Sequence, residues 1–287
     1  MRTRPASMDD VPVTAELVRR SDVFWFGAPE HDEGEVREFF DHTSSFDTDS
    51  VTILDGDRLV GLALRNATDS WYVTEPDANQ DELNRRLIDF YAAGPKPTMQ
   101  ALSRDEQLRG ALAARGWKHD RSMFDLVRPV DDGWTIAEPA WPGGITAREL
   151  RPEDVPAVHH LIYVDAAWAE VAGHPNRAFD DWRTIFVTEH TLPEQQVLAW
   201  RGDRLAGVAM GRTFSDGTGW ISQLAVAKDE RGNGLGRALL LDALRRRRAG
   251  GATSLGLAVQ ADNRGALGLY LSCGLTIDRE WMEYAPR

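Results

Sequence analysis

The sequence predicts an α/β protein made of two tandem copies of one domain, each with a mixed central sheet flanked by helices. Strand-like and helix-like patterns alternate along both halves, which is typical of this fold class. Three features of the first half recur in the same order in the second half, which indicates a duplication. They are Asp10-Val11-Pro12 and Asp154-Val155-Pro156, DGDRLVGLAL (55–64) and RGDRLAGVAM (201–210), and Gly116 with Asp120-Arg121 and Gly274 with Asp278-Arg279.

The first elements expected in each half are a short strand, over 3–6 and 145–150, and a helix opened by Ser7 or Pro152. Apolar and polar residues then alternate around a Gly-Asp turn in both halves, which predicts a hairpin. The rest of the second half predicts, in order, a strand (220–227), a helix (235–249), a strand (254–259), a helix (264–273) opened by Asp262 or Asn263, and a strand ending near Tyr284.

The join between the halves is expected in residues 129–144, PVDDGWTIAEPAWPGG. This segment has three prolines and three glycines and shows neither helical nor strand periodicity. The predicted domains are therefore 1–132 and 145–287. The offset between matching residues grows from 146 to 158 along the chain, so the second half carries about 12 extra residues near its glycine cluster.

The composition restricts the class of protein. The 287 residues are enough for two domains, and no apolar run approaches the ~18 residues of a membrane span, so we expect no membrane partner. The single cysteine, Cys273, forms no intrachain disulfide, and a cytoplasmic monomer or homodimer is expected. The net charge of −12 disfavours nucleic acid as a partner and is compatible with a cationic amine, although acidity can also serve solubility alone.

The glycine cluster RGNGLG (231–236) lies where a predicted strand passes into a predicted helix. Glycine allows a tight turn and the close approach of a ligand to the backbone. The first N–H groups of a helix lack internal partners and favour an anion, and Arg231 and Arg237 add positive charge. These features indicate a cradle for a pyrophosphate. The spacing matches neither the nucleoside-triphosphate loop nor the dinucleotide-binding pattern.

This cluster resembles the coenzyme A pyrophosphate loop of the GNAT superfamily of acyltransferases. The likeness covers LAVAKDERGNGLGRALL, Asn263, Tyr270 and Cys273-Gly274-Leu275 in the order and spacing of that family. It implies two tandem GNAT-like domains and acetyl-CoA as co-substrate, with no metal. The cofactor-binding residues that it implies are Leu224, Ala225, Val226, Arg231, Gly232, Asn233, Gly234, Leu235, Gly236, Arg237 and Asn263.

The resemblance also assigns a role to Tyr270, which matches the tyrosine that often protonates the leaving thiolate in the family. A packed aromatic residue is the alternative interpretation for this position. Asn263 is expected to contact the pantetheine arm, to cap the following helix, or to do both. Cys273 is expected to fill space beside Gly274.

The first half lacks these features. Its corresponding segment, 70–87, contains no glycine and carries Pro76 and acidic residues, which would repel a pyrophosphate. Leu112 stands where the second half has Tyr270. We therefore expect residues 1–132 to be a degenerate GNAT-like domain without the pyrophosphate loop, and 145–287 to be catalytic.

For the acceptor, the two-domain organisation is similar to the mycothiol synthase branch of the family, whose members acetylate the cysteinyl amine of a pseudodisaccharide. That branch has a glutamate on the strand before the loop, where this chain has Trp220. The segment 165–182 corresponds to the family's acceptor-lining region, and it suggests Glu170 or His174 as the group that deprotonates or anchors the amine. Solvated helix residues are the alternative interpretation for both.

The leading hypothesis is an acetyl-CoA-dependent N-acetyltransferase that acts on the primary amine of a small molecule by direct attack. Three alternatives stay open: mycothiol synthase proper, a protein lysine or N-terminal acetyltransferase, and a non-catalytic CoA-binding sensor.

Overall fold

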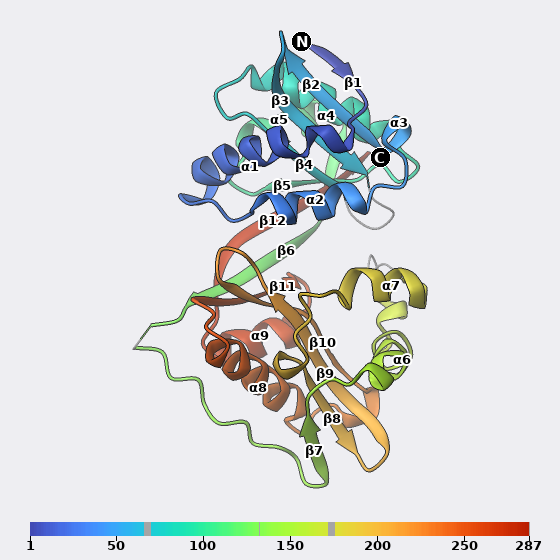
Figure 1. The fold of residues 1–287 in the computed structure, drawn as a ribbon, viewed down its shortest axis with the longest axis vertical. Coiled ribbons are helices and arrows are strands. Elements are labelled where there is room, and N and C mark those ends of the chain that lie inside the picture. The colour runs from blue at the N-terminus through green and yellow to red at the C-terminus, as the bar shows by residue number, and fades with distance from the viewer. Residues whose placement is uncertain (66–69, 132, 172–175, 287) are drawn as a thin grey trace. The chain divides into compact units, whose positions relative to one another are not determined.

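The computed structural model describes residues 1–65, 70–131, 133–171 and 176–286. The chain divides into two compact units, one of Met1–Met123 with Arg279–Arg287 and one of Phe124–Asp278. Each unit has strands flanked by helices, so the predicted fold class is confirmed (Figure 1). Within the described residues, no helix is both long enough and apolar enough to cross a bilayer.

The division of the chain differs from the expected domains 1–132 and 145–287 in two places. Strand β6 (Trp117–Pro129) begins in the first unit and ends in the second, whereas β12 (Thr276–Pro286) does the reverse. The segment expected to be a linker belongs to the second unit, because Trp134 and Ile136 are buried in its core. Their carbonyl groups accept hydrogen bonds from Arg248 and Arg245 of helix α8 (Leu235–Ala249), over 2.9 and 3.1 Å.

The first unit has a sheet in the order β1-β2-β3-β4, in which each pair of neighbours is antiparallel. Its fifth strand, β5, pairs with the part of β12 that belongs to this unit, with Trp281 opposite Leu102. Its elements are β1 (Arg2–Arg4), α1 (Val11–Phe26), α2 (Glu33–Asp41), α3 (Phe46–Asp49), β2 (Ser50–Asp55), β3 (Arg58–Arg65), β4 (Ser70–Thr74), α4 (Gln80–Ala92), β5 (Met99–Leu102) and α5 (Glu106–Ala114).

The second unit repeats this plan with the strand order β7-β8-β9-β10-β11. Strands β7 to β10 are antiparallel, and β11 joins β10 in parallel. Its elements are β7 (Ile145–Arg148), α6 (Val155–His160), a π-helical turn (Leu161–Asp165), α7 (Phe179–Phe186), β8 (Val197–Arg201), β9 (Arg204–Thr213), β10 (Thr218–Val226), α8 (Leu235–Ala249), β11 (Ser254–Gln260) and α9 (Arg264–Ser272).

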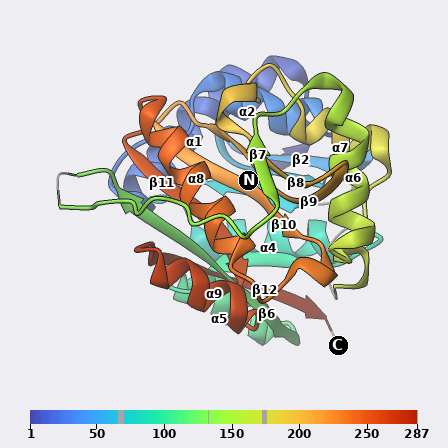
Figure 2. The same cartoon turned by 90° about the horizontal axis from the view of Figure 1, so that it is seen from below.

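Both faces of each sheet are covered by helices. In the second unit, α8 and α9 lie on one side of the strands, and α6 and α7 lie on the other (Figures 1 and 2). The alternation along β8 explains this, since Val197 and Ala199 pack with α8 whereas Leu198 packs with α6 and α7. In the first unit, α4 and α5 cover one face and α1 and α2 cover the other.

Candidate active site

The glycine loop of the second unit connects β10 to α8, as the sequence predicts. Gly232 and Gly234 have φ values of +80° and +92°, which residues with a Cβ atom rarely adopt. A Cβ added at either position would meet no heavy atom within 4 Å. The glycines are therefore required by the backbone conformation, and the loop presents that backbone to open space.

The N–H groups at the start of α8 are only partly used by the protein. Asn233 Oδ1 accepts the hydrogen bond of the Leu235 N–H over 3.1 Å. Among the described residues, the N–H groups of Gly234, Gly236 and Arg237 have no recorded partner. Unpaired N–H groups at the positive end of a 15-residue helix form a site for an anion. The loop therefore fits the pyrophosphate of coenzyme A.

The two loop arginines are held by the protein itself. Arg231 donates to the carbonyl groups of Ala166 and Val226, over 2.7 and 3.2 Å. Arg237 donates to Ser272 Oγ over 2.8 Å at the end of α9. Both side chains are exposed and lie beside the loop. A direct bond from either guanidinium to a phosphate stays a prediction.

A buried carboxylate that the sequence reasoning missed anchors the start of the loop. Glu230 is 5% exposed and accepts two hydrogen bonds from Arg201, over 2.6 and 2.9 Å. Arg204 donates to it as well, over 3.0 Å. Hydrogen bonds from Arg201 hold the pKa of this carboxyl below its usual value. These bonds join the turn of the β8–β9 hairpin to the loop. The two arginines of RGDR (201–204) are the feature of the sequence from which a buried acidic partner could have been predicted.

Strand β10 parts from β11 beside this loop. The parallel ladder runs only from Thr218 opposite Ser254 to Ile221 opposite Leu257. A bulge follows at Ser222, where the register with β9 shifts. Ile221 and Ala225 are four residues apart and would share a face of a regular strand, but they pack in the cores on opposite faces.

The part of β10 beyond the bulge includes the predicted pantetheine-binding residues Leu224, Ala225 and Val226. Leu224 and Val226 are partly buried against the core on the α8 side. No β11 partner is recorded for the described residues of this stretch. One edge of the strand therefore keeps backbone groups that an extended amide-bearing chain could pair with.

Helix α9 supplies the other two predicted residues. Asn263 caps the helix, because its Oδ1 accepts the N–H of Ala266 over 3.2 Å. Tyr270 is 7% exposed, and burial raises the pKa of its phenol to about 12. Burial also raises the pKa of the Cys273 thiol. The cap is observed, whereas contact of Asn263 with pantetheine and proton donation by Tyr270 stay predictions.

The residues considered for the acceptor amine are Glu170, His174 and Trp220, and the structure does not bring Glu170 and Trp220 together. Glu170 lies at the surface, with its carboxylate 2.8 Å from the ammonium group of Lys228. His174 lies outside the described residues. Trp220 packs over Gly256 of β11, where an added Cβ would lie 2.8 Å from its ring. The role of Glu170 or His174 as a base stays a prediction.

A small cavity of about 30 Å³ lies on this side, lined by Phe186, Thr191, Gly211 and the bulged Ser222 among others. None of its described lining residues is a carboxylate. Beside it, the indole N–H of Trp182 donates to Oε1 of the buried Gln223 over 3.1 Å and joins α7 to β10.

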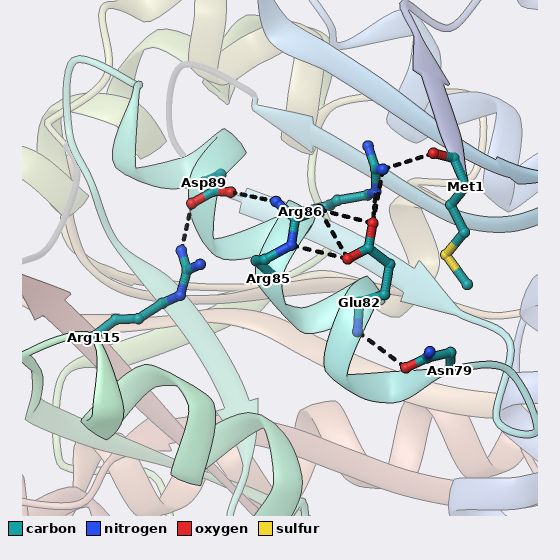
Figure 3. A network of polar contacts seen from close by, with 7 residues as sticks. All are labelled: Met1, Asn79, Glu82, Arg85, Arg86, Asp89 and Arg115. Carbon is teal, nitrogen blue, oxygen red and sulfur yellow. Dashed lines mark hydrogen bonds and ion pairs between the residues drawn. The ribbon is translucent and has the colours of Figure 1, made fainter.

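In the first unit, the N-terminal end of α4 corresponds to the start of α8, and side chains of the protein itself occupy it (Figure 3). Asn79 caps α4 by accepting the Glu82 N–H over 3.2 Å. Glu82 is paired with Arg85 and Arg86, and the hydrogen bonds from Arg85 are the main cause that lowers the pKa of its carboxyl to about 2. Leu112, opposite Tyr270 in the repeat, is fully buried. The first turn of α4 thus carries the acidic residues Asp81 and Glu82, and its capped Glu82 N–H is not open to a phosphate.

Comparison with known proteins decides the family. A model of the acetyltransferase (GNAT) family matches residues 157–275. Mycothiol acetyltransferase of Catenulispora acidiphila is 30% identical over 223 residues, which cover 71% of this chain and 68% of that protein. The chain belongs to the GNAT family of acetyltransferases. A second such protein, mycothiol acetyltransferase of Saccharopolyspora erythraea, is 34% identical over 165 residues, and the alignment spans about half of its length (52%).

Solved structures of GNAT proteins share the whole fold. A GCN5-related N-acetyltransferase from Sphaerobacter thermophilus matches with a TM-score of 0.77 at 21% identity, over 99% of this chain and 94% of that one. A tandem GNAT protein of the clavulanic acid biosynthesis pathway matches with a TM-score of 0.72 at 16% identity, over 99% and 97%. At these identities the likeness concerns the fold, and it confirms the tandem GNAT architecture.

Proposed function

We propose that the second unit transfers an acetyl group from acetyl-CoA to a primary amine of a small molecule. The observation that carries this proposal is the open glycine loop with unpaired N–H groups at the start of α8, next to the place where β10 parts from β11. One feature suits a pyrophosphate and the other suits an extended pantetheine arm. The first unit lacks the loop, so it is assigned no catalytic role.

The residues that would hold acetyl-CoA follow from this arrangement. The backbone of the loop from Arg231 to Arg237 would bind the pyrophosphate, and the backbone of 224–226 would pair with the pantetheine amides. Asn263 stands at the start of the helix that carries Tyr270. The protein contributes mainly by positioning amine and thioester in one cleft.

The proposed transfer is a direct attack. The amine nitrogen bonds to the thioester carbonyl carbon, and a backbone N–H of the 224–226 stretch stabilises the oxyanion. The carbon–sulfur bond then breaks, and the thiolate takes the phenolic proton of Tyr270. With a pKa of about 12, Tyr270 holds its proton at neutral pH. Burial of the CoA thiol would raise its pKa too, as burial does for the Cys273 thiol. The difference between the pKa of the Tyr270 phenol and that of the CoA thiol would then be smaller.

An amine is protonated near neutral pH and must lose a proton before it attacks. Glu170 and His174 are the proposed acceptors or anchors for that proton, with water as the alternative. For Glu170 to act, its ion pair with Lys228 must open. An exposed pair of this kind is worth only about 0–1 kcal/mol, so opening it is no obstacle.

Release of free CoA thiol from acetyl-CoA, measured across a panel of amines, tests the proposal. The panel comprises simple polyamines, aminoglycosides, a lysine peptide and the cysteinyl pseudodisaccharide precursor of mycothiol. Release that depends on a small amine supports the proposal. Release with the lysine peptide alone would establish a protein acetyltransferase, and tight CoA binding without any amine-dependent release would establish a CoA-binding sensor.

The mycothiol precursor is the second, more specific candidate acceptor. The name of two similar proteins, mycothiol acetyltransferase, favours it. Trp220 counts against it, because it stands where that branch is expected to have a glutamate. Rapid release with the precursor alone would identify the acceptor, whereas release with another amine only would retain the enzyme and reject mycothiol synthesis.

A further inference from the structure

The first unit, which has no pyrophosphate loop, contains the larger of the two described cavities. Its volume is about 260 Å³, against about 30 Å³ for the cavity in the second unit. It is lined by residues of α1, α2, β4, β5 and β12, all of which belong to the first unit. This volume is close to the lower end of the range for ligand pockets, about 300 Å³. It is many times larger than the space that one ordered water needs.

The charged residues of this cavity leave it negative. Its carboxylates are those of Asp22, Glu30 and Asp105, and its cationic groups are the Arg279 guanidinium and, when protonated, the His31 imidazole. Even with His31 charged, three negative groups face two positive ones. An excess of negative charge in a partly enclosed space attracts a cation and repels phosphates.

Four of the five charged groups are paired with one another. Arg279 donates two hydrogen bonds to Glu30, over 2.7 and 2.8 Å. Asp22 Oδ2 accepts the backbone N–H groups of Glu30 and His31, over 2.9 and 3.2 Å, and lies 3.2 Å from His31 Nδ1. These pairs hold the wall of the cavity in place, and within each pair the opposite charges compensate one another.

Asp105 is the carboxylate left over. It caps α5 by accepting the Leu108 N–H over 3.0 Å, and among the described residues no cationic side chain lies within ion-pair distance of it, Arg109 of α5 attracting it only from farther away. Burial raises the pKa of its carboxyl. The charge of Asp105 also contributes to the raised pKa of the buried Tyr72, whose main cause is burial. A poorly solvated carboxylate without a cation in direct contact gains when a cation enters the cavity.

Aromatic side chains form much of the remaining wall, namely Trp25, Phe26, Phe39, Trp71, Tyr72 and Trp281. One of them already binds a cation, since the Arg279 guanidinium lies 3.9 Å from the centre of the Phe26 ring. Trp71 is held by stacking on Phe39, with ring centres 4.5 Å apart. Aromatic faces beside a carboxylate are the surroundings that organic ammonium ions prefer.

We infer that this cavity of the first unit binds a compact organic cation, with the positive nitrogen near Asp105 and its alkyl groups against the aromatic wall. The inference does not depend on acetyl transfer by the second unit. It gives the first unit a ligand of its own, of a chemical class opposite in charge to a pyrophosphate.

Three probes of nearly equal shape and different charge test this inference on the full chain. They are choline, its uncharged carbon isostere neohexyl alcohol, and the anion tert-butylacetate, and binding is measured by calorimetry and tryptophan fluorescence. We expect saturable binding of choline at one site, and at least about tenfold weaker binding of the other two. A charge-assisted contact of ~1.5 kcal/mol or more corresponds to that factor.

The Asp105→Asn variant tests whether choline binds beside Asp105. Asparagine is an equally good N-cap, so α5 is retained while the charge is lost. We expect choline binding to weaken at least about tenfold. Asp89→Asn is the matched control, because Asp89 lies on α4 of the same unit, is paired with Arg85 and Arg115, and does not line the cavity (Figure 3). Trp25→Leu, which removes one aromatic face, is a second variant and is expected to weaken choline binding as well.

The inference is wrong if choline shows no saturable binding at millimolar concentration, or if the three probes bind alike. It is equally wrong if Asp105→Asn and Trp25→Leu, each with an unchanged circular dichroism spectrum, bind choline as the unmodified chain does. None of these results would bear on CoA-thiol release by the second unit, so the two proposals fail separately.

Discussion

In the first unit Arg4 donates two hydrogen bonds to Asp10, over 2.6 and 2.8 Å, and in the second unit Arg148 donates two to Asp154, over 2.5 and 2.7 Å. Each aspartate also accepts a backbone N–H three residues before it. The same local bonds thus fix the entry to the first helix in both units. A duplicated sequence has kept the contacts that hold the corner of the fold.

A second shared contact lies beside the place where the units diverge. In the first unit the buried Glu75 is paired with Arg20 and Arg58, and in the second the buried Glu230 is paired with Arg201 and Arg204. Beyond the glutamate, the first unit goes into a capped, acidic helix start and the second into the glycine loop. The buried glutamate is therefore shared by both units, and the proposed binding of an anion would depend on the residues that follow it.

The largest expected effect concerns the glycine loop. Gly234→Val should weaken CoA binding at least about a thousandfold, because three N–H contacts to a phosphate, at ~1.5 kcal/mol each, are lost together. Gly116→Val is the matched control in the first unit, since Gly116 also has a positive φ (+81°) and open space at its Cβ. Calorimetry with CoA should show a loss for the first variant only. Equal losses for both would mean that backbone strain, and not the loop, controls binding.

Removal of the Tyr270 hydroxyl is expected to act on turnover. Tyr270→Phe should lower kcat about a hundredfold, as is typical for loss of a general acid, with little change in the KM for acetyl-CoA. Because burial raises the Tyr270 pKa to about 12, kcat should show no alkaline decline from this group below about pH 10. Tyr91→Phe in α4 of the first unit is the control and should leave kcat unchanged. An unaltered kcat in Tyr270→Phe would leave the thiolate to be protonated by solvent.

The two anchoring glutamates are expected to differ in their effect on CoA. Glu230→Gln and Glu75→Gln should each lower the free energy of unfolding by about 2 kcal/mol, but only Glu230→Gln should weaken CoA binding, by about tenfold. The pKa of Glu230 is lowered in the folded chain, so its stabilising effect is present above the unfolded value of about 4.3 and disappears as the pH falls through the folded value. In denaturant titrations, the free energies of unfolding of the unmodified chain and of Glu230→Gln should therefore differ at pH 7 and become similar at low pH. If both variants lowered the affinity for CoA alike, the expectation that only Glu230 supports CoA binding would be wrong.

The smallest effect is expected at Glu170. Its carboxylate is exposed and paired with Lys228, so Glu170→Gln alone should change kcat less than about threefold, the range of a surface ion pair. Addition of His174→Asn tests whether the two residues replace one another as the base. A fall of more than tenfold in the double variant, at constant acetyl-CoA affinity, would assign the proton acceptor to this pair.

The sequence predicted the duplication, the hairpins, helix α8 over 235–249 and a tight glycine turn before that helix, because each depends on local periodicity or on glycine chemistry. It could not predict that β6 and β12 each run through both units, since strand pairing over long sequence distances leaves no local signal. For the same reason it did not locate the bulge at Ser222 or the burial of Trp134 and Ile136, which read as parts of a linker.

Because β12 begins in the second unit and ends in the first, the order of synthesis differs from the order of the units. The second unit, Phe124–Asp278, is a continuous segment, whereas β5 of the first unit waits for Trp281–Tyr284, which the ribosome makes only after the whole of the second unit. During that interval β5 lacks this neighbour and offers an edge to other chains. The unit translated first is thus the last to be completed, and a nascent chain is most exposed to wrong pairing while its second unit is already folding.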